Sequence, residues 1–190
     1  MPSRLPAAVR ERLDPIRVLV LDVDGVLTDG ILLYGPAGEA VKQFSVRDGL
    51  AIRLLLDAGL SVAVVTGRRS EIIATRCRDL GLHDELVIQG SRDKAADLDE
   101  LERRLGLADH QVAAMGDDLP DIPMLERAGF AACPADAAPE VLATCHLVCG
   151  VPGGRGAIRE VAELLLKAQG RWQEQVGRWI GPDGPKGCPR

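Results

Sequence analysis

Short apolar runs alternate with amphipathic segments along most of this chain. The apolar runs predict strands at residues 18–23, 61–68, 85–88, 111–118, 130–134 and 146–149. Helical spacing of apolar residues predicts helices at 50–60, 70–80, 93–105, 120–129, 139–144 and in the later part of 153–169. Unbroken, branched runs such as VLVL at 18–21 are typical of strands buried on both faces of a parallel sheet. The alternation therefore predicts an α/β fold built from βαβ units.

One segment breaks this alternation. Residues 31–46 alternate apolar and polar positions on either side of a Gly-Pro-Ala-Gly turn, which predicts a β-hairpin inserted after the first strand. The predicted architecture is thus a three-layer, Rossmann-like parallel sheet with a hairpin insert. Hairpin, helix and strand fill the 44 residues between Asp22 and Thr66, so no room remains for a separate cap domain.

Length and composition fit a single domain. With 190 residues, 46% hydrophobic and 27% charged, the chain has enough apolar material for one core. We divide it into an N-terminal extension (1–16), a core (17–169) and a flexible C-terminal tail (170–190). The net charge of -5 argues against a nucleic-acid partner. Without an apolar signal segment or membrane-spanning run, a cytoplasmic enzyme with no membrane partner is expected.

Polar residues gather where the predicted strands end. Asp22 and Asp24 follow the first strand, Thr66-Gly67-Arg68 ends the second, and Gly116-Asp117-Asp118 ends a later one. Carboxyl ends of parallel strands meet at one edge of the sheet, where α/β folds bind ligands. Because clustered carboxylates repel one another, a hard dication, Mg²⁺, is expected among them.

This set of residues suits phosphate chemistry. Asp22 and Asp24 point the same way from a strand, so Asp22 is placed to attack phosphorus while Asp24 handles the leaving group's proton. Thr66 and the amide of Gly67 can donate hydrogen bonds to a phosphate, and Lys94 can supply positive charge.

Other polar residues have less specific signals. Asp118 and Asp121 are assigned a supporting role behind the metal-binding carboxylates, although Asp121 also suits a helix start. Arg68 suits either contact with the substrate or a position on the solvated surface. The three histidines lack partners at useful spacing, and the five cysteines form no pattern of paired metal ligands, so neither set predicts a site.

Four motifs in order give the chain a family resemblance. It resembles the haloacid dehalogenase superfamily of aspartate-nucleophile phosphatases through DVDGVLTDG, VVTGR, the lysine of SRDKAADL, and GDDLPD. Within that superfamily, FSVRDGLAIRLL and GGRGAIRE are similar to the 3-deoxy-D-manno-octulosonate 8-phosphate phosphatases, over about residues 17–169. The resemblance implies a phosphatase of lipopolysaccharide precursor synthesis. It also implies Mg²⁺ held by the Asp22 carboxylate, the Asp24 carbonyl and Asp117.

The resemblance further implies a homotetramer in which hairpins pack together and a neighbouring chain borders each site. Self-association is also the simplest way to cover a site that has no cap. Arg47, Asp48 and Arg155 are the candidates for substrate selection, since an arginine suits the carboxylate of a sugar acid.

Three alternatives stay open. A related family acts on a nine-carbon keto sugar acid 9-phosphate with the same chemistry. A phosphoacceptor signalling domain also combines acidic residues, a threonine and a lysine, but there the acceptor aspartate ends a middle strand, where this chain has VVTGR. A non-catalytic oligomerisation module would have lost the carboxylates that Asp22 and Asp24 retain.

Overall fold

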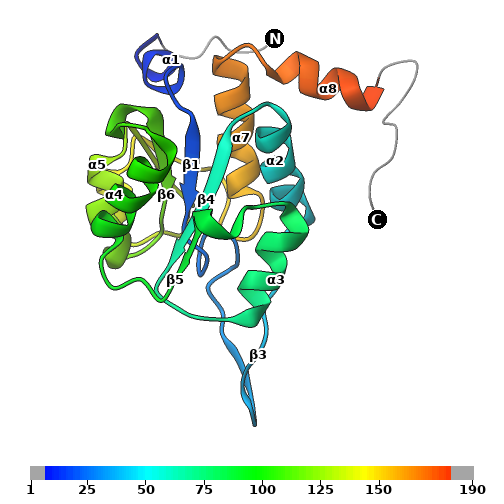
Figure 1. Ribbon diagram of the computed structural model, residues 1–190, viewed down its shortest axis with the longest axis vertical. Coiled ribbons are helices and arrows are strands. Elements are labelled where there is room, and N and C mark those ends of the chain that lie inside the picture. Colours follow the sequence, from blue (N-terminus) through cyan, green and yellow to red (C-terminus); the bar gives the residue numbers. More distant parts are fainter. Residues whose placement is uncertain (1–6, 181–190) are drawn as a thin grey trace.

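A six-stranded parallel sheet forms the centre of the molecule. The computed structural model describes residues 7–180 (Figure 1). The sheet order is β5-β4-β1-β6-β7-β8, and every pairing is parallel. Its strands are β1 (Val18–Leu21), β4 (Ser61–Thr66), β5 (Val87–Gln89), β6 (Val112–Met115), β7 (Phe130–Cys133) and β8 (Leu147–Val148). The predicted α/β class and parallel sheet are confirmed.

Helices cover both faces of this sheet. They are α1 (Ala7–Leu13), α2 (Val46–Asp57), α3 (Glu71–Leu80), α4 (Lys94–Leu105), α5 (Ile122–Arg127), α6 (Pro139–Thr144), α7 (Ala157–Ala168) and α8 (Trp172–Ile180), with 3-10 turns at Asp84–Leu86, Asp109–Gln111 and Leu119–Asp121. Helices α2, α3 and α7 lie on one face and α4 and α5 on the other (Figure 1). Among the described residues, no helix is both long and apolar enough to cross a bilayer.

The alternation of side chains along β1 explains the three layers. Leu19 and Leu21 belong to the core cluster under α2 and α7, while Val18 and Val20 belong to the cluster under α4 and α5. All four side chains are at most 1% exposed. A strand buried on both faces must be apolar at every position, which is the pattern that the sequence displays.

The strand order fixes where a ligand site can form. The strand β1 lies between β4 and β6, and the chain runs outward from it in both directions. The connections therefore diverge at β1, and a crevice opens at the carboxyl ends of the strands on either side of it.

The hairpin projects away from this body (Figure 1). Strands β2 (Leu33–Gly35) and β3 (Gly38–Val41) pair antiparallel, and Gly35 opposes Gly38. Gly38 has a φ of 109°, which only glycine adopts without strain, so the Gly-Pro-Ala-Gly sequence dictates the turn. This insert is confirmed.

Both ends of the core extend further than predicted. Leu13 and Ile16 are fully buried within the core cluster under α2 and α7, so the predicted N-terminal extension contributes these two side chains to the core. Residues 172–180, assigned by the sequence analysis to the tail, form α8. The Trp172 ring lies 5.2 Å from the guanidinium carbon of Arg159 and 5.1 Å from Lys167 Nζ, both on α7. Residues 1–6 and 181–190 lie outside the described part.

Candidate active site

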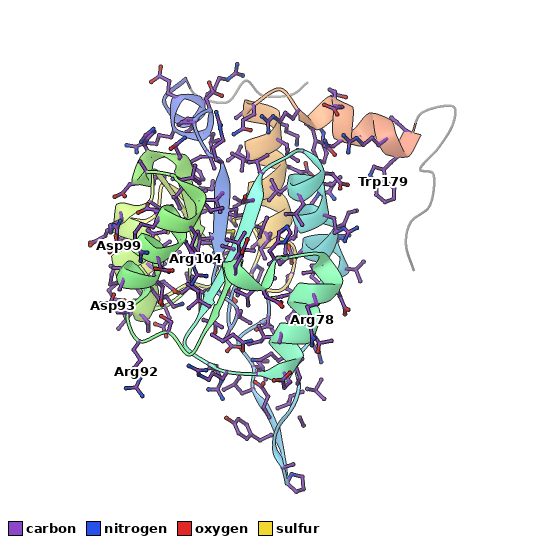
Figure 2. All side chains as sticks on the ribbon, viewed as in Figure 1. Arg78, Arg92, Asp93, Asp99, Arg104 and Trp179 are labelled. Atoms are coloured by element: carbon purple, nitrogen blue, oxygen red, sulfur yellow. The ribbon has the colours of Figure 1, made fainter. Side chains whose placement is uncertain are left out.

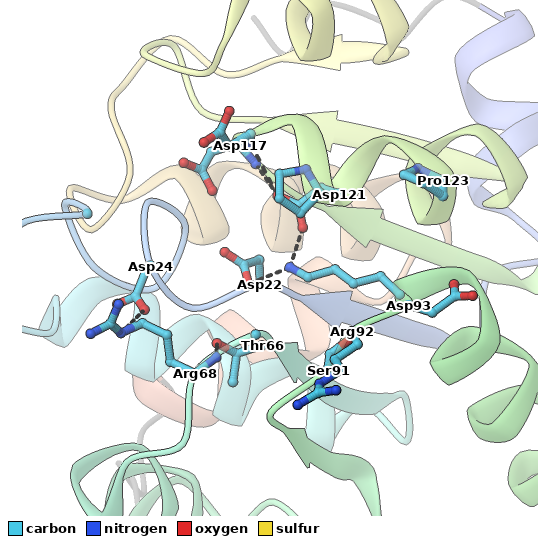
Figure 3. A pocket seen from close by; sticks show the side chains of 15 residues that line it. Asp22, Asp24, Thr66, Arg68, Ser91, Arg92, Asp93, Asp117, Asp121 and Pro123 are labelled. Carbon is cyan, nitrogen blue, oxygen red and sulfur yellow. Dashed lines mark hydrogen bonds and ion pairs between the residues drawn. The ribbon is translucent and has the colours of Figure 1, made fainter.

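The predicted polar residues line one pocket. It has a volume of about 800 Å³ and opens at the carboxyl ends of β1, β4 and β6 (Figure 3). Its lining includes Asp22, Asp24, Thr66, Gly67, Arg68, Lys94, Asp117, Asp118 and Asp121. Residues as distant in the sequence as Asp22 and Asp121 thus line one pocket, where the sequence analysis expects the strand ends to meet.

A buried lysine joins two of the carboxylates. Lys94 Nζ lies 2.7 Å from Asp22 Oδ1 and also donates to Asp121 Oδ1 (Figure 3). The side chains of Lys94, Asp22 and Asp121 are 7%, 9% and 2% exposed. Lys94 begins α4, directly after Asp93, whose side chain accepts from the amides of Ala95 and Ala96. This capping fixes the helix start and therefore the place from which the lysine enters the pocket.

Burial and charge shift the pKa values of Asp22, Asp117 and Lys94. Burial raises the pKa of Asp22 to about 6, with Lys94 opposing and Asp121 assisting the shift. Burial also raises the pKa of Asp117 to about 8, reinforced by repulsion from Asp22, Asp121 and Asp118. The pKa of Lys94 is raised, because the attraction of Asp22 and Asp121 outweighs burial, the largest single influence, which lowers it. The single positive charge of Lys94 does not balance the negative charges of the carboxylates in this pocket.

The carboxylates are arranged to hold a cation. Ligand oxygens of Asp22, Asp117 and Asp121 lie within 4.8 Å of one another. Asp117 Oδ1 is buried without a hydrogen-bond partner among residues 7–180, whereas Asp121 Oδ2 accepts from the amides of Asp117 and Asp118. Gly25 has a φ of 96°, and a Cβ there would come within 2.0 Å of Asp117 Oδ2, so the close approach needs glycine. These oxygens suit a hard dication.

Asp24 lies in a different environment. Its Oδ1 accepts from Lys42, whose Nζ also lies 2.8 Å from Glu39 Oε1 in β3. Its Oδ2 lies 3.8 Å from Arg68 Nε. Arg68 also donates to the Tyr34 hydroxyl of β2. The Asp24 carboxylate is therefore held from the hairpin side and is not a member of the carboxylate cluster, so its predicted metal contact rests on its backbone carbonyl alone.

The end of β4 lies on the other side of the pocket. Thr66 is 1% exposed, and its Oγ1 accepts from the Arg68 amide at 3.4 Å. Gly67 follows in the turn, and Ser91 donates its amide to Thr66 O, which ties the segment after β5 to this edge. Asp118 accepts from the Leu119 amide at the rim.

Three residues of this region escaped the sequence analysis. Ser91 and Arg92 line the pocket between β5 and α4, and Arg92 is exposed at its rim (Figure 2). Their position between a strand end and a helix start was a usable signal. Lys42 carried none, because the hairpin is not part of the sheet and the direction of its side chains cannot be derived from sheet alternation.

The three candidate selectivity residues do not line the pocket. Arg47 and Arg155 are exposed, and Arg155 lies 3.5 Å from Asp29. Asp48 is 1% exposed, and its carboxylate accepts from the amides of Gly156 at 3.0 Å and Arg159 at 2.9 Å. They make no contact with the pocket of their own chain, and their role in substrate selection beside a neighbouring chain stays a prediction.

Asp48 was misplaced because the sequence analysis put the start of its helix too late. Helix α2 begins at Val46, with the Ser45 side chain accepting from the Asp48 amide, so Asp48 and Gly49 lie in the first turn. There Asp48 anchors the glycine loop at 153–156 and the start of α7.

Comparisons with known proteins agree with this geometry. Residues 83–157 match the family model of haloacid dehalogenase-like hydrolases. The chain is 42% identical over 174 residues to the 3-deoxy-D-manno-octulosonate 8-phosphate phosphatase of Escherichia coli (strain B / BL21-DE3), covering 92% of each protein.

Solved structures are similar as well. The corresponding phosphatase of Yersinia pestis superposes with a TM-score of 0.86 at 41% identity, covering 89% of this chain and 90% of that one. The Moraxella catarrhalis phosphatase, in complex with magnesium, phosphate and KDO, gives a TM-score of 0.86 at 35% identity, covering 90% and 97%. This chain belongs to the family of 3-deoxy-D-manno-octulosonate 8-phosphate phosphatases, within the haloacid dehalogenase-like hydrolases.

Proposed function

We propose that this chain is a Mg²⁺-dependent phosphatase that converts 3-deoxy-D-manno-octulosonate 8-phosphate to 3-deoxy-D-manno-octulosonate and phosphate. The observation that carries the proposal is the buried Asp22, paired with Lys94 and adjoining the uncompensated carboxylate of Asp117 in one pocket. Relatives at 42% identity over 92% of the chain bear the name of this activity.

Magnesium fits the residues that are present. We assign its binding to the carboxylates of Asp22 and Asp117 and to the backbone carbonyl of Asp24. The partnerless, buried Oδ1 of Asp117 is the observation that favours a cation here. When bound, the ion neutralises phosphoryl oxygens and so lets an anionic nucleophile approach.

The reaction proceeds in two steps on this chain's own residues. In the first, a carboxylate oxygen of Asp22 attacks phosphorus, and the bond from phosphorus to the sugar oxygen breaks as Asp24 gives that oxygen its proton. In the second, water transfers a proton to Asp24 and attacks the aspartyl phosphate. Inorganic phosphate leaves, Asp22 is regenerated, and Asp24 is again protonated.

The remaining pocket residues hold the phosphoryl group. Thr66 and the Gly67 amide are assigned to donate to its oxygens, with Arg68 at the mouth of the pocket. Lys94 holds Asp22 through Oδ1 at 2.7 Å and supplies positive charge as phosphate arrives. Asp121 in turn orients Lys94 and the amides of Asp117 and Asp118.

A substrate screen tests this proposal. Purified protein with Mg²⁺ is supplied with the eight-carbon 8-phosphate, the nine-carbon keto sugar acid 9-phosphate and simple phosphate esters, and phosphate release is measured. We expect the highest kcat/KM for the 8-phosphate and no release in the presence of a chelator. Preference for the 9-phosphate would identify the related activity, and no hydrolysis of any ester would favour a non-catalytic module.

We further infer that the chain assembles into a homotetramer through its hairpin. Ile31, Tyr34, Val41 and Val46 in and beside the hairpin are 63%, 65%, 48% and 84% exposed, which is a large apolar surface for one short insert. The pocket has no cap domain of its own, so a neighbouring chain is the proposed cover. Sedimentation equilibrium should give four chains per particle, and a monomer would contradict this assembly.

A further inference from the structure

Lys42 is a buried cation that directly follows the hairpin strand β3. Its side chain is only 1% exposed, and its two ionic partners are Asp24 and Glu39. The pKa of Lys42 is raised, because the hydrogen bonds and charges of these carboxylates outweigh burial, which acts in the opposite direction. A buried ammonium is retained only where partners hold it, so this contact is a built feature of the site.

The contact with Lys42 distinguishes the two oxygens of Asp24. Oδ1 accepts from Lys42, whereas Oδ2 is buried and has no hydrogen-bond partner among the described residues. Arg68 Nε lies 3.8 Å from Oδ2, beyond hydrogen-bond distance. With Oδ1 occupied, Oδ2 is the oxygen left for proton exchange in the pocket that Asp24 lines.

We propose that Lys42 is a positioning residue for proton transfer, holding Oδ1 of Asp24 so that Oδ2 gives its proton to the leaving oxygen and later takes one from water. The inference rests on the proposed function, since it assigns a role within the same reaction. Lys42 keeps its own protons throughout, and only the Asp24 proton moves. The hairpin thus supplies one element of the catalytic step.

Because Lys42 has two partners, variants that affect one contact or both can separate the positioning role from a structural one. Glu39 lies on β3 itself, so its contact with Lys42 joins two nearby positions of the hairpin, while the contact with Asp24 joins the hairpin to the pocket. Glu39→Gln weakens the first contact and leaves the second. Lys42→Met removes both, and Lys42→Arg retains a cation for both.

The experiment compares two leaving groups. An alkyl phosphate, the 8-phosphate, needs a proton on its leaving oxygen, whereas p-nitrophenyl phosphate releases a stable anion and needs none. Because kcat/KM with Mg²⁺ reports the steps up to formation of the aspartyl phosphate, we expect Lys42→Met to lower it about 10- to 100-fold for the alkyl ester. For the aryl ester we expect a loss below about threefold, since no general acid is required.

Matched variants complete the test. Lys42→Arg should recover most of the alkyl-ester rate, and Glu39→Gln should change either rate by less than about threefold. Lys167→Met removes a lysine from an exposed ion pair with Glu163 and should leave both rates unchanged. Thermal melting of each variant verifies folding, and Lys42→Gln replaces Lys42→Met if the latter does not fold.

Equal losses on the two esters, or no loss on the alkyl ester, would overturn the positioning role. A wild-type protein that prefers another alkyl phosphate would overturn only the proposed substrate, because the same ratio can be measured with that ester.

Discussion

Asp22 and Asp24 are two residues apart, yet different parts of the molecule hold them. Asp22 is paired with Lys94, which begins α4 and is itself held by Asp121 behind the sheet edge. Asp24 is paired with Lys42 of the inserted hairpin and approached by Arg68, which in turn contacts Tyr34 of the hairpin. The proposed nucleophile is thus positioned by the parallel core and the proposed acid/base by the insert.

This difference indicates that the parallel core and the hairpin have separate roles in the proposed reaction. Asp121 follows β6, which is buried on both faces, and Lys94 begins the helix after the edge strand β5, so the surroundings of Asp22 are set by the parallel sheet and its helices. The hairpin projects from the body, exposes apolar residues and makes its link to the site through side chains. Changes at Asp22 should therefore affect every phosphate ester alike, while changes on the hairpin side should depend on the leaving group.

The largest expected effects come from replacing Asp22 and Asp24 themselves. Asp22→Asn removes the proposed nucleophile and should lower phosphate release at least about a hundredfold for alkyl and aryl esters equally, measured with Mg²⁺. Asp24→Asn should lower alkyl-ester hydrolysis by a similar factor but aryl-ester kcat/KM much less. Turnover by Asp22→Asn at the wild-type rate would overturn the assignment of the nucleophile.

The residues that surround Asp22 in the parallel core could be predicted from the sequence. Asp22, Thr66 and Asp117 end apolar runs, and the parallel sheet brings such ends together. Lys94 was placed correctly because it starts a helix that follows a strand at the same edge. These positions depend on local pattern and on one rule of topology, so no tertiary information was required.

The rest depended on contacts that local pattern does not specify. Lys42 meets Asp24 because the hairpin folds back along the body, and hairpin orientation is set by side-chain packing. Asp48 was read as a loop residue because Gly49 follows it, although Ser45 starts the helix earlier. For α8 a signal was present, since Trp172, Val176 and Trp179 have helical spacing, but the Gly- and Pro-rich sequence after it obscured the pattern.

Removing Lys94, the lysine paired with Asp22, should have the next largest effect. Lys94→Met leaves the buried carboxylates of Asp22 and Asp121 without their cation, and loss of one partner of a buried ion pair typically costs about 3 to 5 kcal/mol. We expect the free energy of unfolding to fall by about 3 kcal/mol, measured by urea denaturation at pH 8 with a chelator present. Lys167→Met, at an exposed pair, is the control and should change it by less than about 0.5 kcal/mol. A similar result for both variants would mean that burial does not distinguish the two lysines.

The carboxylates of Asp22 and Asp117 should also make the stability of the chain depend on pH and on bound metal. The pKa values of Asp22 and Asp117, about 6 and about 8, lie above the 3.8 of an unperturbed aspartate. Between pH 4 and pH 8 the folded metal-free chain therefore holds protons that the unfolded chain has lost, and stability falls as pH rises through the two folded-state values. Mg²⁺ binds the ionised carboxylates, so the rise in melting temperature on adding it should be larger at pH 8 than at pH 5. An equal rise at both values would contradict metal binding by these two aspartates.

The smallest expected effect concerns Asp48, a buried carboxylate that pairs with no lysine in the described part of the chain. Its oxygens accept from the amides of Gly156 and Arg159, and burial raises its pKa while these hydrogen bonds act to lower it. Asp48→Asn keeps one acceptor and loses the other, so we expect unfolding to become easier by about 1 to 2 kcal/mol in urea denaturation. Because Asp48 does not line the pocket, kcat/KM should change less than about threefold for alkyl and aryl esters alike. A selective loss on the sugar acid phosphate would instead show that the glycine loop it anchors reaches the substrate.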